Sequence, residues 1–395
     1  MSGPLSHVRV LDLSRILAAP WAGQVLADLG ADVIKVERPG AGDDTRGWGP
    51  PFHPGGDAGY FLAVNRGKRS ITLDLEKEAG RDIVRRLAAR ADVLLENYKA
   101  GTLARFGLGY AELEKVNPRL VYCSVTGFGQ TGPKREHAAY DFLIQAMGGL
   151  MSITGERDGR PGGGPQKVGV PIVDLMTGMY AATAVLAALA GREVSGKGEY
   201  IDLAMLDVQV ALLSNQAMNY LLSGNAPRRT GNAHPNIQPQ DVFACRDGPV
   251  VVVVGNDAQF VRFCEVLGHP EWARDERYAA NAGRVRNQET LTPMIAGALS
   301  GMARQELIGR LERAGVPCGP INSIPEVFKE PQVVSRGMRV DIGPVPQVAS
   351  PMRFARSPLA YHRPPPRLGE HSAEILRELG MDEAEIEKLR ADGVL

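Results

Sequence analysis

The sequence has few cysteines, no excess of either charge and no long apolar run, and each shortage excludes a class of protein. Its 395 residues contain four cysteines, Cys123, Cys245, Cys264 and Cys318, with no CxxC pair among them. Neither a disulfide scaffold nor a zinc site of paired thiolates is therefore expected. Lys and Arg total 45, as do Asp and Glu, so the formal net charge of +0 gives no indication of nucleic-acid binding.

No stretch is uninterruptedly apolar for the roughly 18 residues that a membrane-spanning helix needs. The richest stretch, Ala181–Ala190, lies within a longer amphipathic helical pattern. The N-terminal sequence MSGPLSHVRVLDLS is too polar for a signal peptide and lacks the character of a transit peptide. We therefore expect a cytoplasmic protein without a membrane partner, and its 44% of hydrophobic residues can supply a buried core.

The first half of the chain alternates short β-rich runs with amphipathic helical segments. This alternation is typical of a mostly parallel sheet with helices on both faces, and it predicts a doubly wound α/β fold. Helices are predicted at Pro20–Leu29, Lys77–Arg90 and Tyr110–Val116. Strands are predicted at Val8–Leu13, Val33–Glu37, Ile71–Leu75, Val93–Glu96 and Val121–Val125.

The pattern changes in the second half. The Gly- and Pro-rich sequence from Thr154 to Gly169 predicts a mobile loop, which a long helix follows at about Asp174 to Leu189. A strand at Tyr200–Ala204 and another helix, ending near Leu222, come next. Asp247-Gly248 then stands between two β-rich runs and is typical of a hairpin turn.

The order of these elements predicts two domains. Residues 1–222 would form the first part of a large domain, and residues 223–325, which open with the linker-like SGNAPRRTGNAHPN, would form a smaller α+β domain. In the remaining segment, 326–395, Pro364–Pro366 exclude a helix locally and favour an extended chain. We expect this segment to return to the large domain, which would then be discontinuous.

Two glycine-rich motifs imitate nucleotide-binding loops, but their surroundings do not fit. GFGQTG at Gly127–Gly132 matches GxGxxG, yet Pro133 and the polar KREH do not open the apolar helix that a dinucleotide site requires. GREVSGKG at Gly191–Gly198 ends in glycine where a P-loop has the Ser or Thr that holds magnesium. Neither GxSxG nor HExxH occurs, so a serine-hydrolase elbow and a helix-based zinc site lack support.

Asp174 is the main catalytic candidate. It stands between an apolar run and a helix of small residues. A carboxylate in the first turn of a helix is favoured by the helix dipole, and this alone would explain its presence. The same dipole would keep the carboxylate ionised beside a loop that could close, so that it could act as a nucleophile. Sequence position leaves both interpretations open.

Four basic residues, Arg15, Arg38, Lys99 and Arg105, come near the carboxyl ends of predicted strands. In a parallel sheet these ends line the crevice where ligands bind. Each residue alone could be a solvated surface charge, but several cations in such a crevice suit an anionic, phosphate-bearing ligand. A nucleotide-like ligand is therefore indicated.

Several motifs, in order along nearly the whole chain, resemble those of the class III CoA-transferases, the CaiB/BaiF or formyl-CoA transferase family. They include VRVLDLSRILAAPWAGQVLADLGADVIKVERPG, NRGKRSITLDL, ADVLLENYKAGTLARFGLGY, NPRLVYCSVTGFGQTGP, PIVDLMTGMYAA, GVPCGPINSIPEVFKEPQV and RPPPRLGEH. The resemblance implies a Rossmann-like large domain built from both ends of the chain, a small domain, and an interlocked homodimer.

The resemblance also implies roles for individual residues. Asp174 matches the catalytic aspartate of the family. This chain has Arg15 and Asp141 where formyl-CoA transferases often have His and Glu. Residues at positions that would bind coenzyme A are Arg15, Ile16, Ala18, Arg38, Leu73, Asn97, Tyr98, Lys99, Arg105 and Tyr140.

The implied reaction uses coenzyme A esters as substrates and needs no permanently bound cofactor or metal. The carboxylate of Asp174 would attack the donor thioester and form a mixed anhydride and free CoA thiolate. The thiolate would then attack the aspartyl carbonyl to give an aspartyl-CoA thioester, and the acceptor acid would repeat the sequence in reverse. Each step passes through an oxyanion, for which backbone N–H groups near Gly162–Gly164 are candidates.

The motifs GAGDDTRGWGPPF and GVPCGPINSIPEVFKEPQV are most similar to the succinyl-CoA:glutarate branch of the family. Oxalate transferases carry a GGGQ-type loop where this chain has GNAHPN, which argues against oxalate. Succinyl-CoA is therefore the expected donor, and a C4 to C6 dicarboxylate such as glutarate is the expected acceptor. The carboxylate that does not react needs a cation or donor, for which Arg46, Arg66 and His234 are candidates.

Two other functions remain open. α-Methylacyl-CoA racemases share coenzyme A binding but move a proton, so they would exchange solvent deuterium into an acyl-CoA without an acceptor acid. A non-catalytic protein that binds CoA esters would not need the aspartate. The presence of Asp174 in a matching motif argues against this second alternative.

Overall fold

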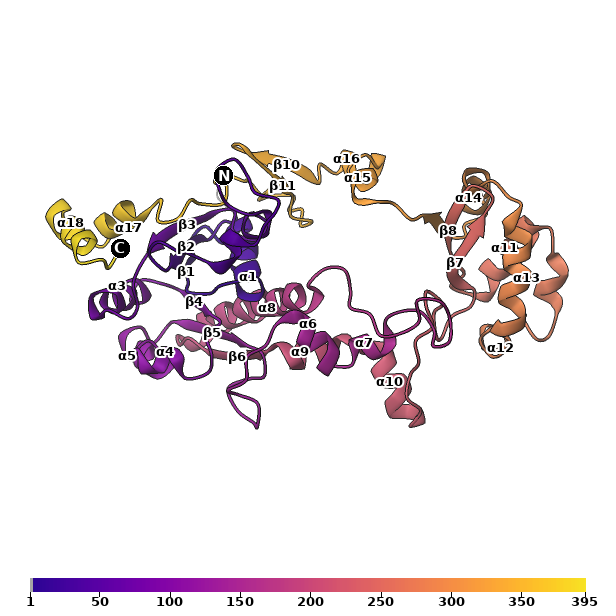
Figure 1. Ribbon diagram of the computed structural model, residues 1–395, viewed down its shortest axis with the longest axis horizontal. Coiled ribbons are helices and arrows are strands. Elements are labelled where there is room, and N and C mark those ends of the chain that lie inside the picture. Colours follow the sequence, from indigo (N-terminus) through magenta and orange to yellow (C-terminus); the bar gives the residue numbers. More distant parts are fainter. Residues whose placement is uncertain (1–2) are drawn as a thin grey trace. The chain divides into compact units, whose positions relative to one another are not determined.

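A computed structural model describes residues 3–395, which form two compact units (Figure 1). The first unit comprises the chain up to Leu150, residues 168–222 and residues 334–395. It is therefore discontinuous and includes both ends of the chain. The second unit comprises residues 151–167 and 223–333, so it takes in a glycine-rich segment that the sequence analysis assigned to the large domain.

A parallel sheet forms the centre of the first unit. Its strands are β1 (Arg9–Asp12), β2 (Asp32–Glu37), β3 (Lys68–Thr72), β4 (Val93–Glu96), β5 (Val121–Thr126) and β6 (Tyr200–Ala204). Their spatial order is β3-β2-β1-β4-β5-β6, and every neighbouring pair is parallel. This is the doubly wound, Rossmann-like order, and it confirms the predicted fold class. The order reverses between β1 and β4, where such sheets bind ligands at their carboxyl ends.

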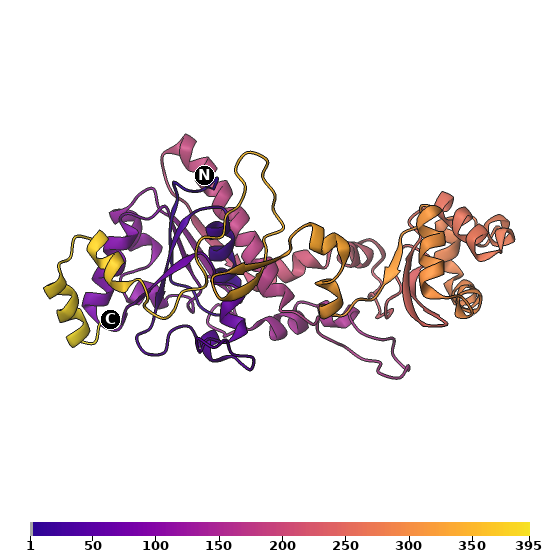
Figure 2. The ribbon, with the colours of Figure 1, turned by 90° about the horizontal axis from the view of Figure 1, so that it is seen from above.

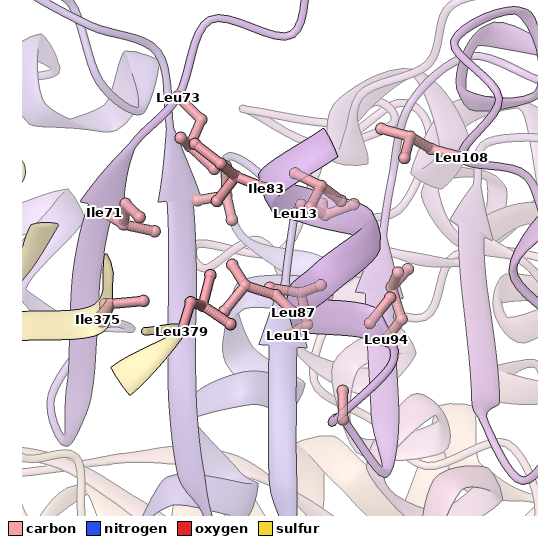
Figure 3. Close-up of a cluster of buried hydrophobic side chains, with 14 of the residues drawn as sticks. Leu11, Leu13, Ile71, Leu73, Ile83, Leu87, Leu94, Leu108, Ile375 and Leu379 are labelled. Carbon is pink, nitrogen blue, oxygen red and sulfur yellow. The ribbon is translucent and has the colours of Figure 1, made fainter. Parts of the chain in front are cut away.

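Alternating side chains of the strands build two cores. Leu11 and Leu94 face α3 (Glu78–Ala88) and α17 (Ser372–Glu378), as Figure 3 shows. α5 (Tyr110–Val116) and α18 (Glu383–Ala391) contribute to the same core. The neighbouring residues Val10 and Val93 face the opposite way, into a core shared with α1 (Ala18–Asp28) and α8 (Ile172–Ser195). Helices on both faces leave only the ends of the strands open to a ligand.

The long helix α8 starts two residues before its predicted beginning and continues to Ser195. Among residues 3–395 it is the one helix that is long and apolar enough to cross a membrane. Its Ala181, Val185 and Leu189 are buried in the core beside α1 and the sheet. A core helix satisfies the same test of length and composition, so α8 alone is weak evidence of a membrane segment.

The second unit contains an antiparallel sheet in the order β7-β8-β9 and its own core, which includes Phe243, Phe260 and Phe263. β7 and β8 form the predicted hairpin, and Gly248 begins β8 at a φ of 141°, which a side chain would strain. Its strands and helices are β7 (Gln240–Cys245), β8 (Gly248–Val253), β9 (Cys318–Pro320), α11 (Asp257–Leu267), α12 (Asn281–Arg286), α13 (Gln288–Ser300), α14 (Arg304–Arg313) and α15 (Ile324–Val327).

Shorter elements complete the chain. The helix expected to end near Leu222 is divided by Ser214, whose φ of 45° interrupts helical geometry. The C-terminal helices α17 and α18, yellow in Figure 2, lie beside the rest of the first unit and share its core. The remaining helices and strands are α2 (Gly59–Leu62), α4 (Thr102–Arg105), α6 (Asp141–Met147), α7 (Leu150–Ile153), α9 (Met205–Leu212), α10 (Ser214–Ser223), α16 (Pro331–Ser335), β10 (Arg339–Ile342), β11 (Val345–Val348) and the 3-10 helices η1 (Asp44–Gly47) and η2 (Pro270–Arg274).

Candidate active site

A cavity of about 370 Å³ lies in the first unit, at the carboxyl ends of β1, β4 and β5. Three of its walls are the segments that follow these strands, namely Arg15–Ala18, Asn97–Ala100 and Val125–Gly127. Asp174, at the start of α8, forms part of the remaining wall. The cavity therefore stands at the reversal of strand order, where an open parallel sheet offers its ligand site.

Most of the residues predicted for the site line this cavity together. They are Arg15, Ile16, Ala18, Asn97, Tyr98, Lys99, Tyr140 and Asp174. Arg38 does not line it, but it shares a carboxylate with Arg15, since both guanidiniums contact Asp44, at 3.2 and 3.0 Å. Arg105 is exposed at the end of α4, and Leu73 is buried in the core beside α3 (Figure 3).

The three residues predicted to bind the second carboxylate are not in this cavity. Arg46 is buried and donates to both oxygens of Glu37, at 2.8 and 2.7 Å, and to Asp57 at 2.9 Å. Arg66 pairs with Asp28 in the same way, at 2.8 and 2.6 Å. These carboxylates use the donors that an acceptor acid would need, so both arginines act within the fold. His234 belongs to the second unit, as do Gly162–Gly164.

Asp141 caps the N-terminus of α8. The helix begins after Pro171 without a side-chain cap of its own. Asp141 Oδ2 accepts hydrogen bonds from the backbone N–H groups of Val173 and Asp174, at 2.7 and 3.2 Å, and so satisfies donors that a helix start leaves free. Gln145 donates to the other oxygen of Asp141 and accepts from the N–H of Val168 at 2.9 Å.

The carboxylate of Asp174, unlike that of Asp141, accepts no hydrogen bond from the described residues. Asp174 is only 8% exposed, and no residue within the described range 3–395 donates a hydrogen bond to its side chain. Burial, and after it the negative charge of Asp141, raise the pKa of Asp174 to about 7. The sequence analysis expected the helix dipole to keep Asp174 ionised. The raised pKa shows instead a carboxylate that is only partly ionised at neutral pH and is unusually basic.

Tyr60 is a neighbour of Asp174 that sequence reasoning missed. Burial, followed by the charges of Asp174 and Asp141, raises the pKa of Tyr60 to about 12. Its hydroxyl therefore stays protonated at neutral pH, close to both carboxylates. Trp48 packs edge-on against the Tyr60 ring, with centroids 5.3 Å apart. No motif singled out this residue, because the short helix α2 that carries it is distant from Asp174 in the sequence.

Two basic side chains were also missed. Arg135 and His137 line the cavity from the polar segment that follows β5. Arg135 pairs with Glu136 at 3.1 Å, and the His137 ring meets Phe128 edge-on. The sequence KREH was used only as an argument against a dinucleotide site. Its position after a strand was the available signal, since the carboxyl ends of parallel strands converge on one ligand site.

The donor set of the cavity indicates which chemistry it can support. Among residues 3–395 there is no group of three or more His, Cys, Asp or Glu side chains arranged to hold a metal ion. Cys123 is inside β5, where burial raises its thiol pKa to about 12, so it is a poor nucleophile. The carboxylate of Asp174 is therefore the main candidate for a reactive group, and Arg15, Lys99 and Arg135 in the cavity wall suit an anionic ligand.

Comparison with known proteins gives a consistent result. The model of CoA-transferase family III matches residues 5–372. A succinate–glutarate CoA-transferase of Agrobacterium fabrum is 51% identical over 386 residues, which cover 95% of this chain and 96% of that protein. A succinyl-CoA:glutarate CoA-transferase of Mus musculus is 43% identical, with 99% of this chain and 90% of that protein covered.

Solved structures agree with the sequence comparisons. The crystal structure of a CaiB/BaiF family protein from Brucella suis is similar to this chain, with a TM-score of 0.85 and 49% sequence identity. The similarity covers 96% of this chain and 100% of that one. It therefore extends over both units and is not limited to the parallel sheet.

Proposed function

The chain belongs to CoA-transferase family III, and from that premise we propose that it moves coenzyme A from succinyl-CoA to a dicarboxylate such as glutarate. The observation that carries this proposal is a buried carboxylate without a hydrogen-bond donor, Asp174, in a cavity with basic walls. The two relatives named for succinate and glutarate support the choice of substrates.

In the proposed reaction Asp174 is the nucleophile. Its carboxylate attacks the carbonyl carbon of succinyl-CoA, the C–S bond breaks, and CoA leaves as a thiolate with a mixed anhydride left on the enzyme. The thiolate attacks the aspartyl carbonyl, which releases succinate and forms an aspartyl-CoA thioester. The acceptor carboxylate then attacks the carbonyl carbon of this thioester, its C–S bond breaks, and CoA thiolate leaves with a new aspartyl–acceptor anhydride on the enzyme. The thiolate attacks the acceptor carbonyl of the anhydride, which gives the acceptor's CoA ester and restores the carboxylate of Asp174.

The surroundings of Asp174 support this role. A carboxylate whose pKa is about 7 is more basic than an ordinary one, so it is a better nucleophile when ionised. No donor has to be displaced from it before attack. Arg15 and Lys99 in the cavity wall, and Arg38 beside Arg15, supply cations for the phosphates of coenzyme A.

We further propose that the protein is a homodimer, interlocked as the family resemblance implies, and that it is cytoplasmic. Exposed apolar side chains support the dimer. Helix α10 has no buried residue, and its apolar side chains Tyr220, Leu221 and Leu222 are 52, 70 and 81% exposed. Monomeric proteins seldom expose apolar side chains in such a group without a partner. Sedimentation equilibrium of the purified protein at micromolar concentration measures the oligomeric state, and a monomer would contradict the proposed dimer.

The test of function is mass spectrometry of the CoA esters formed. The protein is incubated with succinyl-CoA and, separately, glutarate, itaconate, malate, citramalate, 3-hydroxy-3-methylglutarate or oxalate. We expect the glutarate ester to form fastest and the oxalate ester not to form. If no acid accepts CoA, but deuterium enters the α-position of a branched acyl-CoA, the racemase alternative replaces the transferase.

A further inference from the structure

We propose that two buried ion pairs, Lys35–Asp43 and Lys68–Asp12, position the backbone of Ser14–Ile16 at the active-site cavity. The proposal rests on the function proposed above. Lys35 Nζ lies 2.9 Å from Asp43, and Lys68 Nζ lies 2.8 Å from Asp12. All four side chains are 0% exposed. They come from β1, β2, β3 and the loop after β2, so they link the sheet to the segment that follows β1.

The segment they hold has a strained backbone. Ile16 has a φ of 72°, in the left-handed region that a β-branched residue rarely adopts. Only two residues other than glycine have a positive φ in the described chain, and Ile16 is the one at the cavity. Such a conformation persists only where the surroundings determine it, and it occurs preferentially at functional sites.

The two ion pairs supply many of the hydrogen bonds that hold the backbone of Ser14–Ile16 in this conformation. Asp12 Oδ1 accepts from the N–H of Ser14 at 3.0 Å, and Lys35 Nζ donates to the carbonyl of Ser14 at 2.8 Å. Asp43 Oδ1 accepts from the N–H of Ile16 at 3.2 Å. Each ion pair therefore also forms hydrogen bonds, through its carboxylate or its ammonium group, with the backbone of the strained segment.

Asn97 completes the set. Its side chain accepts from the N–H of Arg15 at 2.8 Å and donates to the carbonyl of Arg15 at 2.6 Å. Every backbone polar group from the N–H of Ser14 to the N–H of Ile16 is thus bound by a side chain. Asn97 itself lines the cavity, whereas the four charged residues do not. The charged residues act through the backbone, so they are positioning residues and not catalytic ones.

The position of this segment is tightly linked to the helix that carries Asp174. A Cβ atom built on Gly178 of α8 would lie 2.4 Å from the carbonyl oxygen of Ala18. Gly178 is one turn after Asp174, so the start of α1 touches the backbone of the helix that bears the nucleophile. A shift of Ile16 would therefore move the cavity wall relative to Asp174, where small displacements have large effects on rate.

For the Lys35–Asp43 pair the electrostatics indicate a fixed device and not a pH switch, whereas burial lowers the pKa of Lys68 in the other pair to about 8. Burial alone would raise the pKa of Asp43, but Lys35 and the hydrogen bonds from Thr45 lower it to about 2. The neighbouring carboxylates raise the pKa of Lys35 despite its burial. The Lys35–Asp43 pair therefore stays charged throughout the neutral range. Apolar residues of similar volume commonly replace buried ion pairs without loss of stability, so stability alone does not require this pair.

The double variant Lys35→Met/Asp43→Leu tests the proposal because it removes both charges and leaves neither one unpaired. We expect it to fold, to lower kcat for CoA transfer by about 10- to 100-fold, and to leave the midpoint of the pH–rate profile unchanged. Its matched control is Asp92→Ala, at the opposite ends of the strands. Asp92 also accepts from a backbone N–H, that of Arg9, and pairs with the buried Arg192 at 2.9 Å. This control should change kcat by less than about twofold.

Replacing Ile16 separates positioning from a general structural role. Glycine adopts a positive φ without strain, so an Ile16→Gly background should reduce the loss caused by Lys35→Met/Asp43→Leu, whatever the cost of Ile16→Gly alone. Equal losses in both backgrounds, or a folded double variant with unchanged kcat, would overturn the proposal. If the double variant does not fold, the same comparison is made with Asp43→Asn, which removes the charge but keeps the shape.

Hydrogen exchange gives a readout that does not depend on the reaction. We expect the amides of residues 14–18 to exchange at least about tenfold faster in Lys35→Met/Asp43→Leu than in the wild type. Their exchange rates should be unchanged in Asp92→Ala. If the wild type shows no CoA transfer but this difference appears, the proposed function fails and the positioning role stands. If the exchange rates are equal, the positioning role fails whatever the activity.

Discussion

Asp43 and Asp174 are both buried aspartates of the first unit, but their surroundings differ completely. Asp43 has a lysine at 2.9 Å and accepts hydrogen bonds from Thr45 and Ile16, and its pKa falls to about 2. Asp174 has no donor in the described chain and a second carboxylate nearby, and its pKa rises to about 7. Burial acts on both in the same direction, so the partners decide which carboxylate is structural and which is reactive.

Replacing Asp174 should give the largest effect on activity. Asp174→Ala removes the proposed nucleophile, so we expect the rate of CoA transfer to fall by about 10³-fold or more. Isothermal titration should show that binding of coenzyme A is retained, because the cationic wall is intact. Transfer at more than a tenth of the wild-type rate would mean that Asp174 does not form the covalent intermediate.

Replacing Asp141 tests whether the helix start has to be held. Asp141→Ala removes the acceptor for the N–H groups of Val173 and Asp174, so we expect a loss of about 1–2 kcal/mol in the free energy of unfolding. We also expect a fall of about tenfold or more in kcat, because the nucleophile is no longer fixed. Steady-state kinetics and urea unfolding measure the two effects. Ser323→Ala, which removes a cap in the second unit, should lower stability without the same fall in kcat.

The comparison of Asp43 with Asp174 also predicts opposite effects on stability. The pKa of Asp174 is about 7 in the folded chain and 3.8 when unperturbed, so the unfolded state releases this proton at lower pH. Stability should therefore fall as the pH rises from about 4 to about 7 and stay level above that. Asp174→Asn avoids this loss and should be more stable than the wild type at pH 8, by on the order of 2–4 kcal/mol.

Urea unfolding at pH 5 and pH 8 measures this difference between variant and wild type. The gain should be larger at pH 8. Asp43→Asn should behave in the opposite way, because the folded chain holds that pKa at about 2, below its usual value of 3.8. Its carboxylate therefore stabilises the fold at every pH above about 4. A stabilising Asp43→Asn or a destabilising Asp174→Asn at pH 8 would reverse the distinction between the two residues.

The strands of the sheet were easier to predict from the sequence than the charged side chains that are buried in it. The bounds of β4, β6 and α5 agree with the predictions. β3 was predicted at Ile71–Leu75, but it begins at Lys68. The prediction missed its start because Lys-Arg is not the apolar pattern expected of a buried strand. Lys68 is neutralised by Asp12, 56 positions earlier, and local pattern does not reveal such a partner.

The same limitation affected the site. The strand ends, for Lys99, and the family resemblance, for Asn97 and Tyr98, were sufficient to predict these residues at the cavity. They could not show that Asp141, 33 positions before Asp174, accepts the hydrogen bonds of the helix start. Arg46 and Arg66 were predicted as substrate ligands because the sequence does not reveal the carboxylates, Glu37 and Asp28, with which they form buried ion pairs.

The smallest predicted effect concerns the pH dependence of the reaction. For the wild type, kcat/KM should rise with pH to a plateau, with its midpoint near the Asp174 pKa of about 7, because only the ionised carboxylate attacks. Asp141→Asn keeps an oxygen that can accept from Val173 and Asp174 but removes the negative charge. Burial is the larger cause of the raised pKa and remains, so the midpoint should fall by only about half to one pH unit.

Rates of CoA ester formation between pH 5 and pH 9 provide this measurement, with Asp92→Asn as a charge-matched variant at the opposite ends of the strands. Asp92→Asn should leave the midpoint in place. A midpoint that moves upward in Asp141→Asn would mean that Asp141 stabilises the ionised form of Asp174. The basicity of the nucleophile would then come from burial alone, and Asp141 would act on the reaction only through the hydrogen bonds that fix the start of α8.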